Sequence, residues 1–252
     1  MVQVCLNGTR GPADGWMVPV SPGALADAAV EAVAAGATDV HLHPKTPCGH
    51  DTLSPRVLAV TLEAIRARVS VPIGVTTGAW AEPDPVARAE RIRTWTTLPD
   101  HASVNWHEPG AEEVATALLD RGVGVEAGIW SGTDGAARFT ASPLRTRVLR
   151  ILAEVTDPAE GAAENASEEE NTSEATARAL LAALTCDHGR PVLLHGENAS
   201  AWPVLRLAAR LGLATRIGLE DTLLLPNGER ASSNAQLVAE GLAQYGAARR
   251  SS

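Results

Sequence analysis

The stretch DVHLHPKTPCGHDTLSPRVLAVTLEAIRARV, residues 39–69, contains the unit on which the fold is built. It opens with a short run of alternating character, Asp39 to His43, which predicts a β-strand. The pair Ser54-Pro55 then predicts a helix start, with serine as the N-cap and proline in the first helical position. Apolar residues at spacings of three and four continue to Val69. The stretch is therefore one βα unit.

The same unit recurs along the rest of the chain. Short β-rich runs alternate with longer helical patterns, and Gly, Pro, Asp or Ser separates them. The eight predicted strands are Val2 to Asn7, Asp39 to His43, Ile73 to Thr77, Ala102 to Trp106, Val123 to Ile129, Arg147 to Val155, Pro191 to His195 and Arg216 to Glu220. The predicted helices include Pro22 to Ala35, Pro55 to Val69, Pro85 to Trp95, Glu112 to Arg121 and Ser200 to Leu211.

Two architectures accommodate a repeated βα unit. Eight units close into a (β/α)8 TIM barrel, whereas a doubly wound open sheet usually has fewer strands and a glycine-rich first turn. No GxGxxG motif follows the first predicted strand, and 252 residues are a typical length for one barrel. The sequence therefore predicts an α/β protein with a single (β/α)8 barrel domain over residues 1–252.

The composition excludes several classes of partner. The net charge is −9, whereas capture of nucleic acid or of an anionic membrane needs a basic face. No run of about 18 apolar residues occurs, and no basic leader precedes the first strand. The cysteines Cys5, Cys48 and Cys186 lack CxxC spacing. We expect a soluble enzyme in the reducing cytoplasm.

One segment interrupts the repeat after the sixth strand. Residues Asp157 to Glu174, DPAEGAAENASEEENTSE, are acidic, small and polar. Such a composition cannot bury enough apolar surface to fold by itself. The sequence predicts a mobile acidic loop here.

Two histidines on the second predicted strand are candidate metal ligands. Side chains alternate along a strand, so His41 and His43 point to the same face near its carboxyl end. In a barrel that face is the interior, and two imidazoles there suit a borderline divalent metal such as zinc. The alternative is that hydrogen bonds in a polar barrel mouth satisfy both histidines.

The eighth predicted strand ends in two acidic residues. Closure of the barrel places strands eight and two on either side of strand one, so Glu220 is expected to complete a His-His-Glu set, with Asp221 at the same rim. Arg216 shares the strand parity of Glu220 and needs a carboxylate partner, which Asp221 or a substrate acid supplies. Alternatively, Glu220 belongs to an acidic surface turn.

Further polar residues at the strand ends point to the same mouth. Active sites on this fold are assembled from the ends of several strands, although any one of these residues can also be a capping or turn residue. The candidate substrate or catalytic contacts are Thr76, Thr77, Ser103, Asn105, Glu126, His195 and Glu197.

Five motifs of the chain resemble those of the β-keto acid cleavage enzymes, the family that includes the 3-keto-5-aminohexanoate cleavage enzyme. They occur in the same order along most of the chain. The motifs are VHLHP at 40–44, VTTGA at 75–79, ASVN at 102–105, RIGLED at 216–221 and SSNAQLV at 232–238.

The resemblance implies a zinc-bound (β/α)8 barrel that condenses a β-keto acid with acetyl-CoA and gives acetoacetate and a new acyl-CoA by a retro-Claisen cleavage. The metal ligands of the family fall on His41, His43 and Glu220. The resemblance also implies a homo-oligomer, a tetramer. A Lewis acid that polarises the keto oxygen agrees with the metal site expected from the residues themselves.

The resemblance also assigns roles around the metal. Asp221 falls on the general base of the family, held by Arg216. Thr76 and Ser103 fall on the residues whose hydroxyls bind the substrate carboxylate. Glu126 matches a catalytic glutamate of the family if a gap of one residue is allowed.

Three departures from the family concern the substrate and CoA. Arg10 stands where the named member has an acidic residue that contacts its substrate's amine, so we expect a substrate with a neutral or acidic tail. The acidic segment 157–174 replaces a glycine-rich loop after strand six. LLHGE at 193–197 replaces a small-residue motif. An acidic loop at the mouth would repel the CoA phosphates unless it folds away.

Two other functions remain open from the sequence. One is a metal-dependent carbon–carbon lyase or hydrolase that uses the same site without CoA. The other is an inactive barrel that binds metal and serves a binding or regulatory role. Incubation with acetyl-CoA and a panel of β-keto acids separates the three functions.

Overall fold

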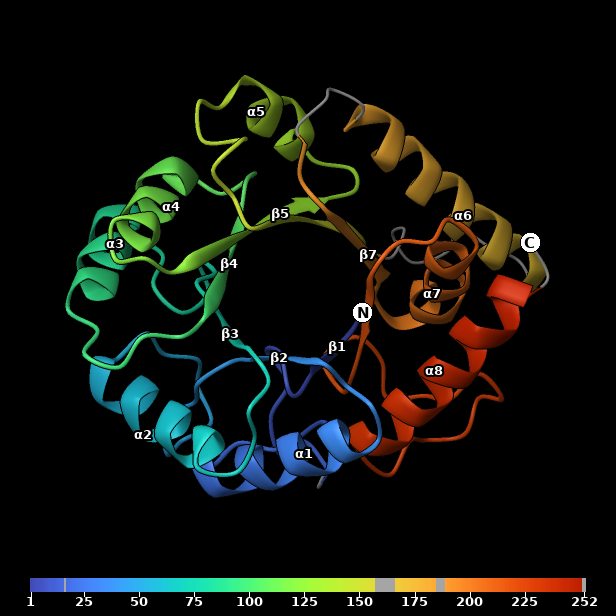
Figure 1. The fold of residues 1–252 in the computed structure, drawn as a ribbon, viewed down its shortest axis with the longest axis horizontal. Coiled ribbons are helices and arrows are strands. Elements are labelled where there is room, and N and C mark those ends of the chain that lie inside the picture. The colour runs from blue at the N-terminus through green and yellow to red at the C-terminus, as the bar shows by residue number, and fades with distance from the viewer. Residues whose placement is uncertain (16, 157–165, 185–188, 251–252) are drawn as a thin grey trace.

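The structure is a computed structural model and describes residues 1–15, 17–156, 166–184 and 189–250. Strands and helices alternate along these residues (Figure 1). The strands are β1 (Val2–Cys5), β2 (Asp39–Leu42), β3 (Ile73–Thr76), β4 (His101–Asn105), β5 (Gly124–Trp130), β6 (Arg150–Val155), β7 (Val192–Gly196) and β8 (Thr215–Ile217). The α-helices are α1 (Pro22–Ala34), α2 (Pro55–Arg66), α3 (Pro85–Arg93), α4 (Ala111–Leu119), α5 (Gly135–Ala141), α6 (Ala166–Ala183), α7 (Ala201–Arg210) and α8 (Asn234–Arg250), and a short 3-10 helix covers Asn198–Ser200.

The strands form a closed parallel barrel. Their order is β7-β6-β5-β4-β3-β2-β1-β8. The ring closes between β7 and Ala214, just before β8, where the Leu194 N–H donates to the Ala214 carbonyl at 2.9 Å. The helices surround the ring in Figure 1. The predicted (β/α)8 barrel is confirmed, and each predicted strand matches to within three residues at either end.

Three helices begin with a Ser-Pro or Asp-Pro pair, and in two of them the side chain before the proline caps the helix. The Ser21 hydroxyl accepts a hydrogen bond from the Ala24 N–H at 3.2 Å, and Asp84 accepts one from the Val86 N–H at 2.8 Å. Each of these caps precedes a proline at the first helical position. Ser54 precedes α2 in the same way, but its side chain makes no capping bond. Among the described residues, no helix is long and apolar enough to cross a membrane.

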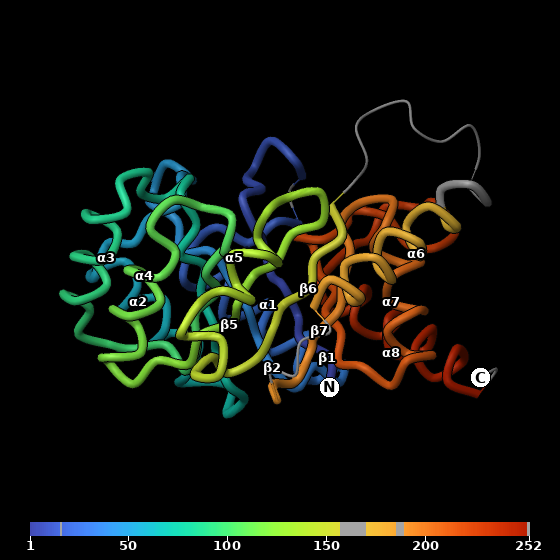
Figure 2. The backbone as a smooth tube through the Cα atoms, turned by 90° about the horizontal axis from the view of Figure 1, so that it is seen from above, coloured from blue at the N-terminus to red at the C-terminus, as the bar shows by residue number. Residues whose placement is uncertain are grey.

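The apolar core lies between the strands and the surrounding helices. Outward residues such as Val40, Leu42 and Val75 are completely buried against them. β1 begins at the lower edge of the side view in Figure 2, so the carboxyl ends of the strands, which form the mouth, lie toward its upper edge. The helices thereby stabilise the barrel from outside, and the inward-facing side chains of the strands fill its interior.

The lower interior of the barrel is polar. We call five inward side chains from five strands the floor network: Gln3, Asp39, His101, Glu126 and Arg150. Arg150 contacts Glu126 at 2.6 Å and Asp39 at 2.9 Å, and His101 lies 3.0 Å from Asp39 and 2.9 Å from Glu126. Burial opposes a charge on His101, but the Glu126 and Asp39 carboxylates together outweigh it and raise the pKa of His101 to about 10. The network is therefore a closed set of two acids and two cations.

The last strand is shorter than predicted. β8 ends at Ile217, and the chain turns at Gly218, whose carbonyl accepts the N–H of Asp221 at 3.0 Å. A Cβ at Gly218 would lie 2.0 Å from the Cys5 carbonyl oxygen, so the close approach of β1 requires glycine there. Arg216 and Glu220 therefore meet across a turn and not through strand parity.

The predicted acidic loop is wrong over its second half. Residues 166–174 begin α6, whereas residues 157–165 lie outside the described residues. Glu170 and Glu174 pair with Arg206 and Arg210 of α7, and the later residues of the helix, such as Ala177, are buried. Packing against α7 thus stabilises a helix that composition alone does not favour. Cys186 also lies outside the described residues.

Candidate active site

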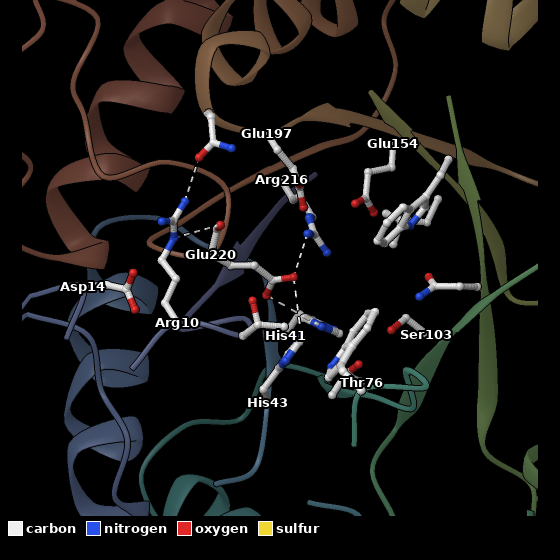
Figure 3. Close-up of a pocket in the computed structure, with 16 residues that line it drawn as sticks. Arg10, Asp14, His41, His43, Thr76, Ser103, Glu154, Glu197, Arg216 and Glu220 are labelled. Atoms are coloured by element: carbon white, nitrogen blue, oxygen red, sulfur yellow. Dashed lines mark hydrogen bonds and ion pairs between the residues drawn. The ribbon is translucent and has the colours of Figure 1, made fainter. Parts of the chain in front are cut away.

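A cavity of about 400 Å³ opens at the mouth of the barrel (Figure 3). Its volume is that of a site for a small molecule. The residues that line it are Thr9, Arg10, Asp14, His41, His43, Thr76, Trp80, Ser103, Asn105, Trp130, Leu152, Glu154, Glu197, Asn198, Arg216 and Glu220. Because they come from the carboxyl ends of all eight strands, the cavity lies where this fold places its active sites.

Three side chains in the cavity form a possible metal site. One donor atom each of His41, His43 and Glu220 lies within 4.8 Å of the others. His41 Nε2 is 3.9 Å from Glu220 Oε2, and His43 Nε2 is 3.6 Å from Glu220 Oε1. Donors around a tetrahedral zinc ion are about 3.4 Å apart, given bonds of about 2.0–2.1 Å. The buried Glu220 Oε2 has no hydrogen-bond partner among the described residues, so the three side chains fit a divalent metal.

Both histidines have a carboxylate behind the ring. His43 Nδ1 lies 3.4 Å from Asp51, which in turn contacts Lys45 at 2.6 Å, and His41 Nδ1 faces Glu126 at 3.9 Å. Metal-bound histidines commonly have a carboxylate at the other ring nitrogen, because it fixes the ring orientation. Burial lowers the pKa of His41 to about 4, so its imidazole is neutral and can donate a lone pair to a metal.

Arg216 joins the acidic residues at the end of β8. Its guanidinium donates to Glu220 at 2.8 Å, and its Nε contacts Asp221 at 3.0 Å and His195 Nδ1 at 3.2 Å. Burial opposes ionisation of Glu220, but Arg216, His43 and His41 together outweigh it and hold the pKa of Glu220 well below its usual range. Arg216 therefore helps to keep a candidate metal ligand ionised.

Asp221 and His195 lie behind Arg216 and do not line the cavity. Both are buried, with His195 3.4 Å from Asp221 and 3.3 Å from Glu154. Asp221 Oδ2 has no hydrogen-bond partner among the described residues. Asp221 thus lies next to the predicted arginine, as expected, but one layer deeper than the predicted rim. His195 was predicted to contact the substrate directly, but it is buried and does not line the cavity.

Glu154 and Glu197 form a carboxyl pair on the β6–β7 side of the cavity, and each carboxyl group influences the pKa of the other. Burial, and then the nearby Glu154 carboxylate, raises the pKa of Glu197 to about 9. Glu197 is therefore protonated at neutral pH, whereas His195 helps to keep Glu154 ionised.

The β3–β4 side of the cavity carries neutral polar groups. Thr76 and Ser103 are direct register partners on adjacent strands, and both line the cavity, as does Asn105. Thr77 does not line it, because its hydroxyl donates to the Ser103 carbonyl at 2.7 Å and ties β3 to β4. Of these four candidates, the structure places three in the cavity.

Glu126 lies below the cavity in the floor network. It is completely buried, and Arg150 and His101 hold its carboxylate. Sequence reasoning placed it among the catalytic residues because it matches a strand-five glutamate of the family when a gap of one residue is allowed, but its height along β5 is lower than the cavity. Its nearest link to the site is His41.

Several cavity residues were not anticipated from the sequence. Leu152 and Glu154 alternate with Arg150 on β6, so their parity was a usable signal. Trp80 stacks on His43 with a centroid distance of 5.8 Å, and Trp130 lies beyond it at 6.3 Å. Both tryptophans come at or after a strand end, where aromatic residues are usually assigned to the core.

Arg10 borders the cavity beside Glu220. Its Nε donates to the Glu220 carbonyl at 3.4 Å, and its Nη2 donates to the Asn198 side chain at 2.8 Å. These contacts fix the guanidinium at the edge of the cavity, as the dashed lines in Figure 3 show.

Comparison with known proteins gives a family match and fold matches. The family model for beta-keto acid cleavage enzyme matches residues 1–158 and 167–250. No curated protein matches the sequence. Among solved structures, ObcA with a C4-CoA adduct and oxalate superposes with a TM-score of 0.72 at 15% identity over 94% of this chain and 65% of that chain. ObcA with oxaloacetate gives 0.68 at 16% identity over 89% and 63%.

A glycoside hydrolase family structure, GH5_18 from Streptomyces cattleya in complex with GlcNAc, also superposes. Its TM-score is 0.51 at 16% identity, over 97% of this chain and 80% of that one. The chain spans less than two thirds of the length of the ObcA structures. At these identities the structural likenesses show the barrel fold alone.

Proposed function

Because the chain belongs to the beta-keto acid cleavage enzyme family, we propose that it condenses a β-keto acid with acetyl-CoA and releases acetoacetate and a new acyl-CoA. A bond forms between C2 of the keto acid and the acetyl carbon. The bond between the acetyl carbon and the CoA sulfur breaks, and the sulfur adds to the keto carbon. The bond between C2 and the keto carbon then breaks, and C2 takes back the proton that it gave up at the start. The observation that carries this proposal is the His41, His43 and Glu220 cluster in the cavity, next to Arg216, which pairs with the buried Asp221 behind it.

The proposed cofactor is a divalent metal held by His41, His43 and Glu220. Zinc is our choice, since two imidazoles and one carboxylate with an open position are a known catalytic zinc set. When bound, the metal would act as a Lewis acid toward the keto oxygen of the substrate.

The substrate carboxylate is proposed to bind on the β3–β4 side of the cavity. Thr76 and Ser103 present hydroxyl groups there from adjacent strands, and Asn105 lies further toward the mouth. Hydroxyl and amide groups can donate hydrogen bonds to a carboxylate, so this side of the cavity can bind one without a buried cation. In this binding mode, C2 of the substrate would lie between the hydroxyl groups and the metal ligands.

Asp221 is proposed to take the proton from C2. Its Oδ1 accepts from Arg216, and its Oδ2 is without a hydrogen-bond partner among the described residues, so it retains acceptor capacity. Since Arg216 separates Asp221 from the cavity, the proposal includes a shift of the guanidinium toward the bound substrate. His195 contacts Asp221 from behind and would hold its orientation.

The test is incubation of the zinc-loaded protein with acetyl-CoA and a panel of β-keto acids. The proposal expects acetoacetate and a matching acyl-CoA in equal amounts. Cleavage of the keto acid without CoA would instead support a lyase or hydrolase, and metal binding without consumption of any keto acid would support a binding role.

The same panel tests the substrate tail. We propose a neutral or acidic tail because the Arg10 guanidinium borders the cavity beside Glu220. Efficient turnover of amino-substituted keto acids alone would refute this assignment. We also propose a homo-tetramer, as in the family, which light scattering of the purified protein tests.

A further inference from the structure

A second cavity adjoins the candidate active site. Its volume is about 560 Å³, and it shares Arg10 and Asn198 with the first cavity. It lies over the start of α7 and the turn after β8. We call it the arm groove, and its lining is Arg10, Asn198, Ala199, Trp202, Thr222, Leu223, Leu224, Leu225, Pro226, Gly228 and Arg230. A ligand in this groove would reach the metal cluster without crossing the barrel wall.

The middle of the arm groove is apolar. The Trp202 indole is fixed there because its N–H donates to the Leu224 carbonyl at 2.9 Å. The Leu224 side chain is 45% exposed although it is a large apolar group. Burying this surface under a ligand would be favourable by about 25 cal/mol for each Å² covered.

The charged groups of the arm groove are both cations. Arg10 lies at its border with the active site, and Arg230 lies away from that border, held by a bond of 2.7 Å to the Asp14 carbonyl. Among the described residues that line the groove there is no Asp or Glu. This is a local positive region on a chain whose net charge is −9, and a guanidinium retains further N–H donors for phosphate oxygens.

We propose that the arm groove binds the pantetheine arm and the phosphates of the acyl-CoA co-substrate, an inference that rests on the proposed function. The arm is long, with apolar segments and amides, and it ends in phosphates, which matches an apolar wall that leads to Arg230. The thioester end would enter the active site past Arg10 and Asn198.

The contacts of α6 support this route. Acidic residues after β6 would repel CoA phosphates, but Glu170 pairs with Arg206 at 2.7 Å, and Glu174 pairs with Arg210. Both pairs join α6 to α7, so these two acids are offset by cations and do not border the groove.

The test measures CoA binding to the zinc-loaded enzyme by titration calorimetry. Reversal of charge in Arg230→Glu is expected to weaken CoA binding roughly tenfold, about 1.4 kcal/mol. The matched control is Arg93→Glu, which makes the same charge change at an exposed position on α3, across the barrel in Figure 1. Pantetheine, which has no phosphates, should bind the wild type and Arg230→Glu alike but bind Leu224→Asn more weakly.

Equal CoA affinity in wild type, Arg230→Glu and Arg93→Glu would overturn the proposal, as would equal weakening by both variants. The KM for acetyl-CoA in the cleavage assay provides a second measurement. Turnover with a KM that Arg230→Glu does not raise would refute the groove and leave the proposed function intact. CoA binding that depends on Arg230, without any cleavage, would refute the proposed function and leave the groove intact.

Discussion

The floor network and the mouth of the barrel are built from the same strands but differ in how their charges meet. β2 supplies Asp39 to the floor and His41 to the mouth, and β6 supplies Arg150 and Glu154 in the same way. In the floor, each acid contacts two cations at 3.0 Å or less. In the mouth, Glu220 Oε2 lies 3.9 Å from His41 Nε2, and neither it nor Asp221 Oδ2 has a hydrogen-bond partner among the described residues. Glu126 Oε2 in the floor has none by the same criterion, but it lies only 2.9 Å from His101 Nδ1.

This difference separates stability from binding. In the floor, every acid already has two cationic partners and needs no ligand. In the mouth, the acids have oxygens that a bound metal or substrate would still have to pair with. Breaking the floor should therefore lower the free energy of unfolding, and breaking the mouth should remove metal or activity with little effect on the metal-free fold.

The largest expected effect is the loss of a metal ligand. His43→Ala should abolish stoichiometric zinc and lower activity at least roughly 10³-fold, because several kcal/mol of charge stabilisation disappear. Elemental analysis and the cleavage assay measure this. His50→Ala is the control, since His50 is exposed on the same loop. Unchanged zinc in His43→Ala would contradict the metal site.

The second effect concerns the proposed base. Asp221→Asn preserves the size of a buried side chain, so the protein should fold and keep its zinc. Its kcat should fall by about 10²–10⁴-fold, the usual contribution of a general base. A kcat close to that of wild type, measured at saturating acetyl-CoA, would remove Asp221 from this role.

The third effect belongs to the floor. Arg150→Met leaves Asp39 and Glu126 without one of their two cations, and loss of a buried partner destabilises by about 3–5 kcal/mol. Urea unfolding of the metal-free protein measures this loss. The folded fraction should still bind one zinc, in contrast to His43→Ala. A loss below about 1 kcal/mol would show that the floor is not the more stabilising layer.

The fourth effect is a pH dependence of the floor. Because the pKa of folded His101 is raised to about 10, its stabilising charge is fully present below the unfolded value of about 6.5. This contribution falls as the pH rises and is lost above about 10. The unfolding free energies of wild type and His101→Gln, both metal-free, should therefore converge between pH 7 and 10. Parallel curves would contradict the charged state of His101.

The smallest effect is a gain of stability at the mouth. Folded Glu197 has a raised pKa of about 9, so it keeps a proton that the unfolded chain releases above about pH 4.3. The free energy of unfolding therefore falls as the pH rises from about 4.3 to about 9. Glu197→Gln removes this penalty and should stabilise the protein by about 1 kcal/mol at pH 8. Thermal unfolding at pH 5 and pH 8 tests it, since the gain should be confined to the higher pH.

The barrel and the His41–His43 pair could be predicted because they depend on repeat count and strand parity. Arg216 and Glu220 were predicted to meet through strand parity, but they meet across the turn at Gly218. Depth could not be predicted in the same way. Glu126 pairs in register with Ser103 on one side and Arg150 on the other, and this stagger sets its height below the cavity. Parity is a property of one strand, whereas height depends on all eight together.

The α6 helix shows a second limit of the sequence. The composition of residues 166–174 indicates a loop, but the cations that pair with Glu170 and Glu174 lie on α7, 36 residues further along the chain. Long-range partners of this kind leave no local signal. Asp221 was predicted to lie at the rim for a similar reason. The turn at Gly218 that moves it deeper depends on contact with β1, which is distant in the sequence.

The position of β8 next to β1 has a consequence for biosynthesis. His41 and His43 are made early, but Glu220 joins them only after nearly the whole chain has left the ribosome. A nascent chain that lacks β8 therefore has two imidazoles and no third ligand. Stable zinc loading would report that the last strand has docked, and the ion would then hold the first and last quarters of the chain together.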